Sequence, residues 1–116
     1  MKLHNVAIFV LLFLSVSVIS DAVKKDALVG GWTPIKDTKD PHVAEIAQFA
    51  VTEYGKQSGV KLILVKVVKG ETQVVSGTNY RLVLAAKDKS VTKSYEARVW
   101  EKPWLHFRNL TSFTPL

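Results

Sequence analysis

Apolar residues recur at three- and four-residue spacing in the first half of the chain and gather into short runs in the second half. The helical spacing starts after Asp40-Pro41, where Asp is a favourable N-cap and Pro suits the first helical position. Gly55 and Gly59 are both suitable ends, so the pattern predicts one amphipathic helix of about 15–18 residues. Its apolar face comprises Val43, Ile46, Ala47, Ala50 and Tyr54, widened by Phe49 and Val51.

The later apolar runs are rich in β-branched and aromatic residues, which is typical of strands. These runs cover residues 61–70, 79–88, 92–101 and 105–113, with breaks at 76–77, 87–90 and 102–103. Breaks this short predict hairpins, because a parallel connection needs a longer crossover. The predicted fold class is therefore α+β, with one amphipathic helix packed against a four- to five-stranded antiparallel sheet.

The N-terminal segment has the pattern of a secretory signal peptide. Lys2 and His4 precede an apolar run from Val6 to Ile19, and Ser20-Asp21-Ala22 follows as a small-x-small cleavage site. The run is shorter than the roughly 20 residues that a membrane-spanning helix needs. We therefore expect a signal peptide over residues 1–22, cleaved after Ala22 or, as second choice, after Ser20. The protein would then be secreted, either to the cell exterior or to a vacuole.

The remaining residues, 23–116, form one predicted domain that begins with an extended arm over residues 23–39. The precursor carries a net charge of +6, and removal of Lys2 and Asp21 leaves 15 − 9 = +6. Lys and Arg are scattered singly among apolar residues, which indicates a solvated basic surface rather than a nucleic-acid site. The chain has no cysteine, so it has neither disulfides nor a thiol nucleophile nor a Cys-based zinc site.

Residues that could carry out catalysis are poorly placed for it. Ser76 precedes Gly77 but lacks a glycine two positions earlier, as a nucleophile elbow would require. The candidate bases are His42, in the first helical turn, and His106, which we expect on a face of the last strand. The acidic residues are dispersed along the chain. The sequence therefore predicts no enzyme activity, no metal and no cofactor.

Three apolar elements have no predicted cover from the chain itself: Gly30-Gly31 with its neighbour Trp32, Val74-Val75 and Pro103-Trp104. In an antiparallel meander the first and third hairpin turns lie at the same end of the sheet, so the last two elements should be neighbours. The arm could reach the same end. Taken singly, each has an ordinary explanation, such as a hinge or a strand end. Together they indicate a partner site, because exposed contiguous apolar surface usually marks one.

These motifs, in this order, resemble those of the plant cystatins, secreted or cytosolic inhibitors of papain-like cysteine proteases. The resemblance covers residues 24–113 and includes the helix segment IAQFAVTEY at 46–54. Gly55 departs from it, because the family commonly has Asn there. The signatures are the arm glycines Gly30 and Gly31, the Gln-x-Val-x-Gly loop Gln73, Val74, Val75, Ser76 and Gly77, and the pair Pro103 and Trp104.

The resemblance implies a sheet wrapped around the helix and a reversible, competitive mechanism without a covalent bond. Gly30 and Gly31 would let the arm pass close to the protease, residues 73–77 would block the centre of its cleft, and Trp104 would cover the primed side. The partners would be papain-like proteases, endogenous or from herbivores or pathogens, with no nucleic acid and no membrane. We expect a monomer. Val75, β-branched at a tight turn, is predicted to be strained, and opening of that hairpin would give a domain-swapped dimer.

Two further readings of the residues stay open. A secreted basic module that binds carbohydrate or a cell-wall polymer would use the scattered lysines together with exposed Trp32 and Trp104. In addition, Asn109-Leu110-Thr111 is an N-glycosylation sequon, which makes Asn109 a candidate modification site.

Overall fold

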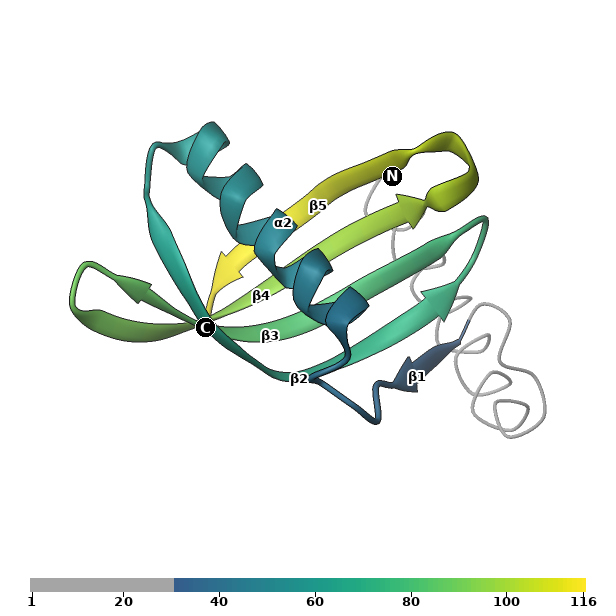
Figure 1. Cartoon of the computed structure of the whole chain (residues 1–116), viewed down its shortest axis with the longest axis horizontal. Helices are drawn as coiled ribbons and strands as arrows, with labels where there is room; N and C mark the ends of the chain where they lie inside the picture. Colours follow the sequence, from purple (N-terminus) through teal and green to yellow (C-terminus); the bar gives the residue numbers. More distant parts are fainter. Residues whose placement is uncertain (1–30) are drawn as a thin grey trace, which may run out of the picture.

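A computed structural model describes residues 31–116 as one helix lying across a five-stranded antiparallel sheet in the order β1-β2-β3-β4-β5 (Figure 1). The predicted signal peptide (1–22) and Gly30 lie outside the described residues. The predicted fold class is confirmed. The elements are β1 Trp32–Pro34, α2 Pro41–Ser58, β2 Leu62–Val74, β3 Thr78–Asp88, β4 Val91–Lys102, the 3-10 helix η1 Pro103–Leu105 and β5 Phe107–Pro115.

Helix α2 begins and ends at residues that the sequence singles out. The Asp40 side chain accepts hydrogen bonds from the backbone N–H of His42 at 2.8 Å and of Val43 at 3.4 Å, which caps the first turn. Gly59 ends the helix in the left-handed conformation, with φ at 78°, and its N–H donates to the Gly55 carbonyl. Gly55 therefore stays inside the helix, where a glycine costs about 1 kcal/mol relative to alanine.

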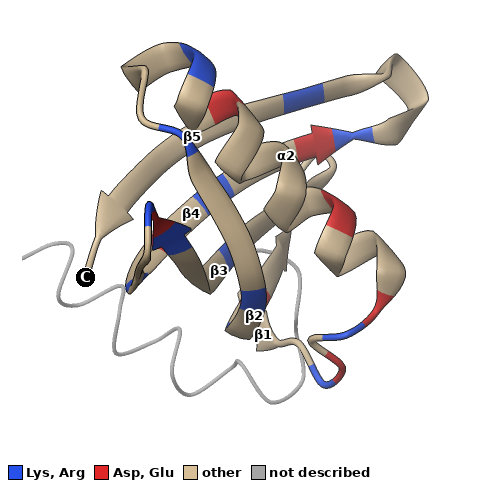
Figure 2. Ribbon diagram, turned by 60° about the vertical axis from the view of Figure 1, so that its left-hand side comes forward, with Lys and Arg blue, Asp and Glu red and all other residues tan. Residues whose placement is uncertain are grey.

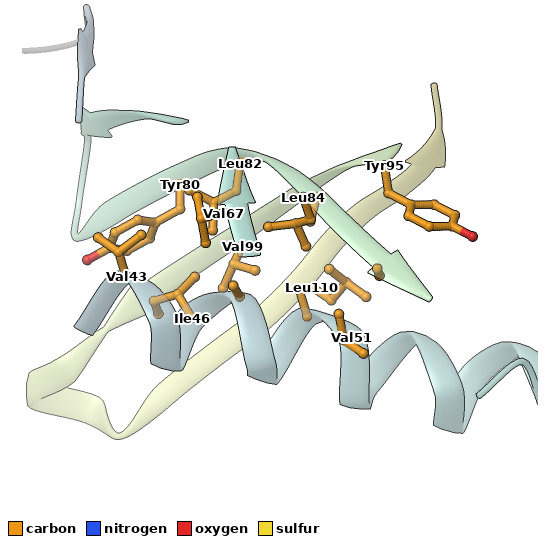
Figure 3. Packing of buried hydrophobic residues seen from close by; sticks show 14 of the residues in the cluster. Val43, Ile46, Val51, Val67, Tyr80, Leu82, Leu84, Tyr95, Val99 and Leu110 are labelled. Atoms are coloured by element: carbon orange, nitrogen blue, oxygen red, sulfur yellow. The ribbon is translucent and has the colours of Figure 1, made fainter. Parts of the chain in front are cut away.

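The core lies between α2 and the concave face of the sheet. Figure 3 shows Val43, Ile46 and Val51 of the helix pointing toward side chains of the sheet. Ala47 and Ala50 are fully buried, and such small side chains let the helix approach the sheet closely. The sheet contributes Leu62, Val67, Tyr80, Leu82, Leu84, Ala86, Tyr95, Ala97, Val99 and Leu110 to this core.

Several strand boundaries differ from the predicted ones by one or more residues, and the structure explains two of these differences. Strand β2 continues to Val74, beyond the predicted end at residue 70, because residues 71–73 are paired with β1 on one side and β3 on the other. Strand β5 begins at Phe107 rather than at residue 105, because η1 and a left-handed His106 (φ 50°) precede it. The expectation that His106 lies on a strand face is therefore wrong. Within residues 31–116, no helix is long and apolar enough to span a membrane.

Candidate functional site

One end of the sheet brings together the three apolar elements that the sequence singles out, as far as the structure describes them. Strand β1 pairs with β2 so that Trp32 lies opposite Gln73, which places Gly31 next to the β2–β3 turn. The β2–β3 and β4–β5 connections lie at that same end in Figure 1. The Trp100 indole N–H donates to the Ser76 carbonyl at 3.0 Å and joins the two hairpins. We call this end, formed by residues 31, 73–77 and 103–105, the loop edge.

The β2–β3 turn presents two valines to solvent. The last ladder pair is Val74 with Thr78, and the Val75 N–H donates to the Gly77 carbonyl at 3.1 Å across the turn. Val74 is 58% exposed and Val75 44% exposed. The left-handed positions are Ser76, with φ at 47°, and Gly77, with φ at 99°. The prediction of strain at Val75 is therefore wrong, because the turn places its positive φ angles on the two following residues.

Gly77 allows strand β4 to approach this turn. A Cβ atom at position 77 would lie 2.3 Å from the Glu101 carbonyl oxygen and 3.0 Å from Cγ of Lys102. No side chain fits at the first distance, and the positive φ angle independently favours glycine. The glycine of the Gln-x-Val-x-Gly segment thus fixes how the two hairpins of the loop edge pack together.

The β4–β5 connection exposes Trp104. Pro103–Leu105 form one turn of 3-10 helix, closed by a hydrogen bond of 3.0 Å from the His106 N–H to the Pro103 carbonyl. Trp104 is 63% exposed. Trp100, by contrast, is half-buried, with its ring centroid 5.4 Å from that of Phe107 and the Lys102 ammonium 4.1 Å above it. Of these two tryptophans, Trp104 is therefore the one available to a partner.

Trp32, the tryptophan of the arm, packs on its own sheet. The Arg81 guanidinium lies 4.1 Å from its ring centroid, and Arg81 Nε donates to Glu71 Oε1 at 2.8 Å. Trp32 is consequently half-buried. The expectation of an exposed Trp32, on which the polymer-binding alternative partly relied, is wrong because this cation–π contact covers the ring.

A network of ionisable side chains centred on the buried Glu101 lies next to the loop edge. Glu101 is only 4% exposed, and its carboxylate binds His42 Nε2 at 2.7 Å and Arg108 Nη2 at 2.6 Å. Arg108 Nη2 also donates to Glu45 at 2.8 Å. The network therefore ties the start of α2 to β4 and β5, next to the backbone that Gly77 contacts.

Burial and hydrogen bonding act in opposite directions on the ionisable groups of this network. Burial alone raises the pKa of Glu101, but hydrogen bonds from His42 and Arg108 outweigh it and hold that pKa below its usual range. For Arg108, burial lowers the pKa, and the hydrogen bonds to Glu101 and Glu45 raise it overall. Burial and the neighbouring Glu101 carboxylate raise the pKa of Tyr80 to about 12. Glu101 is therefore held ionised.

Sequence reasoning missed this network, because it treated the acidic residues as dispersed. Glu45 and Arg108 are 63 positions apart, and only the fold brings them together. One signal was present: Glu101 occupies the inward position of β4 that follows Ala97 and Val99, both buried. A carboxylate in such a position needs partners.

The loop edge offers no arrangement for catalysis. His42, one of the two candidate bases, binds Glu101, and His106 is exposed at the end of η1. Residues 31–116 contain no group of three or more His, Cys, Asp or Glu side chains that could hold a metal ion. What the loop edge does present is neutral, largely apolar surface, which suits contact with another protein.

The family model described as an aspartic acid proteinase inhibitor matches residues 35–116. Cysteine proteinase inhibitor 1 of Actinidia chinensis var. chinensis is 57% identical over 90 residues, which cover 78% of this chain and 78% of that protein. Cysteine proteinase inhibitor 5 of Arabidopsis thaliana is 61% identical over 90 residues, covering 77% and 74% respectively.

Two solved structures are similar to this fold. The salivary cystatin from the soft tick Ornithodoros moubata superposes with a TM-score of 0.66 at 25% identity, covering 75% of this chain and 97% of that one. The squash aspartic acid proteinase inhibitor superposes with a TM-score of 0.57 at 33% identity, covering 69% and 86%.

Proposed function

Because the chain belongs to the plant cystatin family, whose members are proteinase inhibitors and not enzymes, we propose that it inhibits papain-like cysteine proteases reversibly and competitively. The arm glycines Gly30 and Gly31, the turn at residues 73–77 and the pair Pro103-Trp104 enter the active-site cleft together. No covalent bond to the catalytic cysteine forms. The relatives named as cysteine proteinase inhibitors support this protease class.

The observation that carries the proposal is the exposure of Val74, Val75 and Trp104 side by side on one preformed edge. Such residues stay exposed only at a cost, and a partner's cleft offers them cover. Gly31 has no Cβ, so the arm can approach the protease backbone closely. Because the turns are already held in place, little ordering opposes binding, and an interface of about 800 Å² per partner supports nanomolar affinity.

The test is the titration of papain with the chain over residues 23–116, reading residual activity on a fluorogenic peptide. We expect stoichiometric inhibition that excess substrate reverses, as a competitive and non-covalent mechanism requires. Full papain activity at micromolar concentrations of the protein would overturn the proposal. Inhibition that persists after gel filtration under dissociating conditions would contradict the non-covalent mechanism.

A second candidate function is inhibition of aspartic proteases, which the family-model match and the squash structure favour. The matched residues, 35–116, exclude the arm glycines but include both hairpin turns. Parallel titrations of papain and pepsin separate the two classes. Deletion of residues 23–31 should weaken papain inhibition and leave any pepsin inhibition unchanged.

The sequence pattern of the N-terminal segment supports a proposal about where in the cell the protein is sent. Residues 1–22 act as a signal peptide, so that the inhibitor enters the secretory pathway and meets endogenous proteases or those of herbivores and pathogens. The apolar run from Val6 to Ile19 supports this. Expression of the full chain in plant cells, followed by N-terminal sequencing, should yield a protein that starts at Val23. A protein that retains residues 1–22 would contradict it.

The inhibitor acts as a monomer. Although Val75 is not strained, Ser76 in the same turn is a non-glycine residue with a positive φ angle of 47°, and opening of the β2–β3 hairpin would relieve this conformation and convert the inhibitor into an inactive swapped dimer. In such a dimer β2 and β3 would run on as one strand, and the turn at Val75–Gly77 would be lost. Heating and slow cooling followed by gel filtration tests this. We expect a dimer fraction without inhibitory activity, whereas monomer alone after this treatment would contradict the exchange.

A further inference from the structure

The outer face of the β4–β5 hairpin carries the sequon Asn109-Leu110-Thr111. Along β5, Leu110 is buried in the core, so the adjacent Asn109 lies on the opposite face of the sheet, where it is exposed. Its side-chain amide makes no hydrogen bond to any of residues 31–116. Strand β5 is the last in the sheet order, so no further strand flanks it. The acceptor nitrogen is therefore open to modification.

Aromatic side chains lie next to this amide. Trp100 is the ladder partner of Asn109 on β4, and Phe107 precedes Asn109 by two residues on the same face of β5. The two rings meet edge to face at 5.4 Å. A sugar linked to Asn109 could place its apolar C–H surface on this pair and remove part of it from water.

The third residue of the sequon is also accessible. A bulge in the β4–β5 ladder pairs Arg98 with Ser112 and Val99 with Leu110, so Thr111 has no ladder partner. Its hydroxyl donates to the Arg98 carbonyl at 3.1 Å, and the residue is exposed. A modified Asn109 thus disturbs neither the core nor the ladder of the native fold.

We propose that Asn109 is N-glycosylated when the chain enters the secretory pathway; this rests on the proposed signal peptide and not on protease inhibition. The donor is a polyprenyl-diphosphate-linked oligosaccharide. Nδ2 of Asn109 attacks the anomeric carbon of the first sugar and loses one proton. The bond from that carbon to the diphosphate oxygen breaks, and the lipid diphosphate leaves with the electron pair.

The test is expression of the full chain, residues 1–116, in plant cells and mass measurement before and after treatment with an N-glycan amidase. We expect a mass decrease on treatment, its loss in Asn109→Gln and in Thr111→Ala, and its retention in Thr111→Ser. A matched reporter is Ser90→Asn combined with Asn109→Gln. It creates a sequon with Val91 and Thr92 in the exposed β3–β4 turn at the other end of the sheet.

Each other outcome overturns the proposal for a different reason. If the Ser90→Asn reporter carries a glycan and the native chain does not, the chain reaches the transferase but Asn109 is not an acceptor. If neither carries one, the chain does not meet the transferase, and the secretory route fails with it. Papain titration of the unglycosylated chain over residues 23–116 tests the proposed inhibition separately from both results.

Discussion

Trp100 and Trp104 are four positions apart in the sequence, but one packs within the fold and the other is exposed. Trp100 lies against Phe107 and binds the Ser76 carbonyl, whereas Trp104 is 63% exposed and makes no ring contact or side-chain hydrogen bond within residues 31–116. Trp104→Ala should therefore weaken papain inhibition by at least about 30-fold, roughly 2 kcal/mol, because truncated interface tryptophans commonly cost this much. Its thermal unfolding should match that of the unmodified chain.

The control for Trp104→Ala is Val91→Ala, which truncates a side chain 55% exposed at the opposite end of the sheet. This variant should inhibit papain as the unmodified chain does. Equal inhibition by the Trp104→Ala variant would mean that the Pro-Trp turn lies outside the protease interface.

Two glycines with positive φ angles differ in the space around them. Substituting each with alanine therefore separates the cost of a strained backbone from the cost of a steric clash. A Cβ at Gly77 would meet the Glu101 carbonyl oxygen at 2.3 Å, whereas one at Gly59 would have nothing within 4 Å. Gly59→Ala should therefore cost only the conformational term, about 1 kcal/mol of unfolding free energy. Gly77→Ala should cost at least about 2 kcal/mol more in urea unfolding, because β4 must also move. Equal losses in the two variants would contradict this role for Gly77.

At the scale of elements, local signals predict the helix well and the strand ends poorly. Asp40 and Gly59 mark the ends of α2 in the sequence itself, since capping depends on neighbouring residues. The start of β5 depends on the 3-10 turn, and the end of β2 depends on pairing with β1. Pairing over a long sequence separation leaves no local signal, so the end of β2 could not be predicted.

The contact between α2, β4 and β5 depends on the charge of Glu101. Glu101→Gln keeps the shape but removes the charge that His42 and Arg108 bind, so unfolding free energy at pH 7 should fall by about 2 kcal/mol. Because the folded-state pKa of Glu101 is lowered, its contribution is fully present above the unfolded value of about 4.3 and is lost as pH falls through the folded value. Urea unfolding from neutral to acid pH should show a shallower decline for the variant.

Glu96→Gln on the same strand is the control. Its carboxylate pairs with Arg98 at 3.4 Å on the outer, solvated face, where an ion pair contributes at most about 1 kcal/mol. This variant should keep the acid dependence of the unmodified chain. If Glu101→Gln also keeps it, the buried network is not what couples stability to pH.

At the scale of the whole molecule, the sequence predicts the loop edge because strand order alone places alternate turns together. A four-strand meander puts the turns after β2 and after β4 at one end whatever the details of packing. The burial of the Glu101 carboxylate and the packing of Arg81 over the Trp32 ring could not be predicted in this way. Each depends on contacts between elements that are far apart in the sequence. The loop edge could therefore be located from the sequence, but the contacts that support it could not.

The distribution of charge over the molecule predicts that salt affects protease binding and polymer binding differently. The whole chain has a net charge of +6, and within residues 31–116 the basic residues lie on several strands and loops, with acidic residues among them (Figure 2). The loop-edge residues Val74, Val75 and Trp104 are neutral, and Lys102 beside them has its ammonium over Trp100. Salt screens charges beyond a Debye length of roughly 10 Å at 0.1 M, so it should have little effect on binding through this edge.

The inhibition constant for papain should therefore change less than about threefold between roughly 0.05 and 0.5 M salt, measured with a substrate whose own turnover is corrected at each concentration. Binding to an acidic polysaccharide through scattered lysines would weaken steeply over the same range. A steep loss of papain inhibition would instead mean that the basic surface, and not the apolar edge, contributes most of the affinity. The proposal that the apolar loop edge makes the main contact with the protease would then be wrong, even if papain is the target.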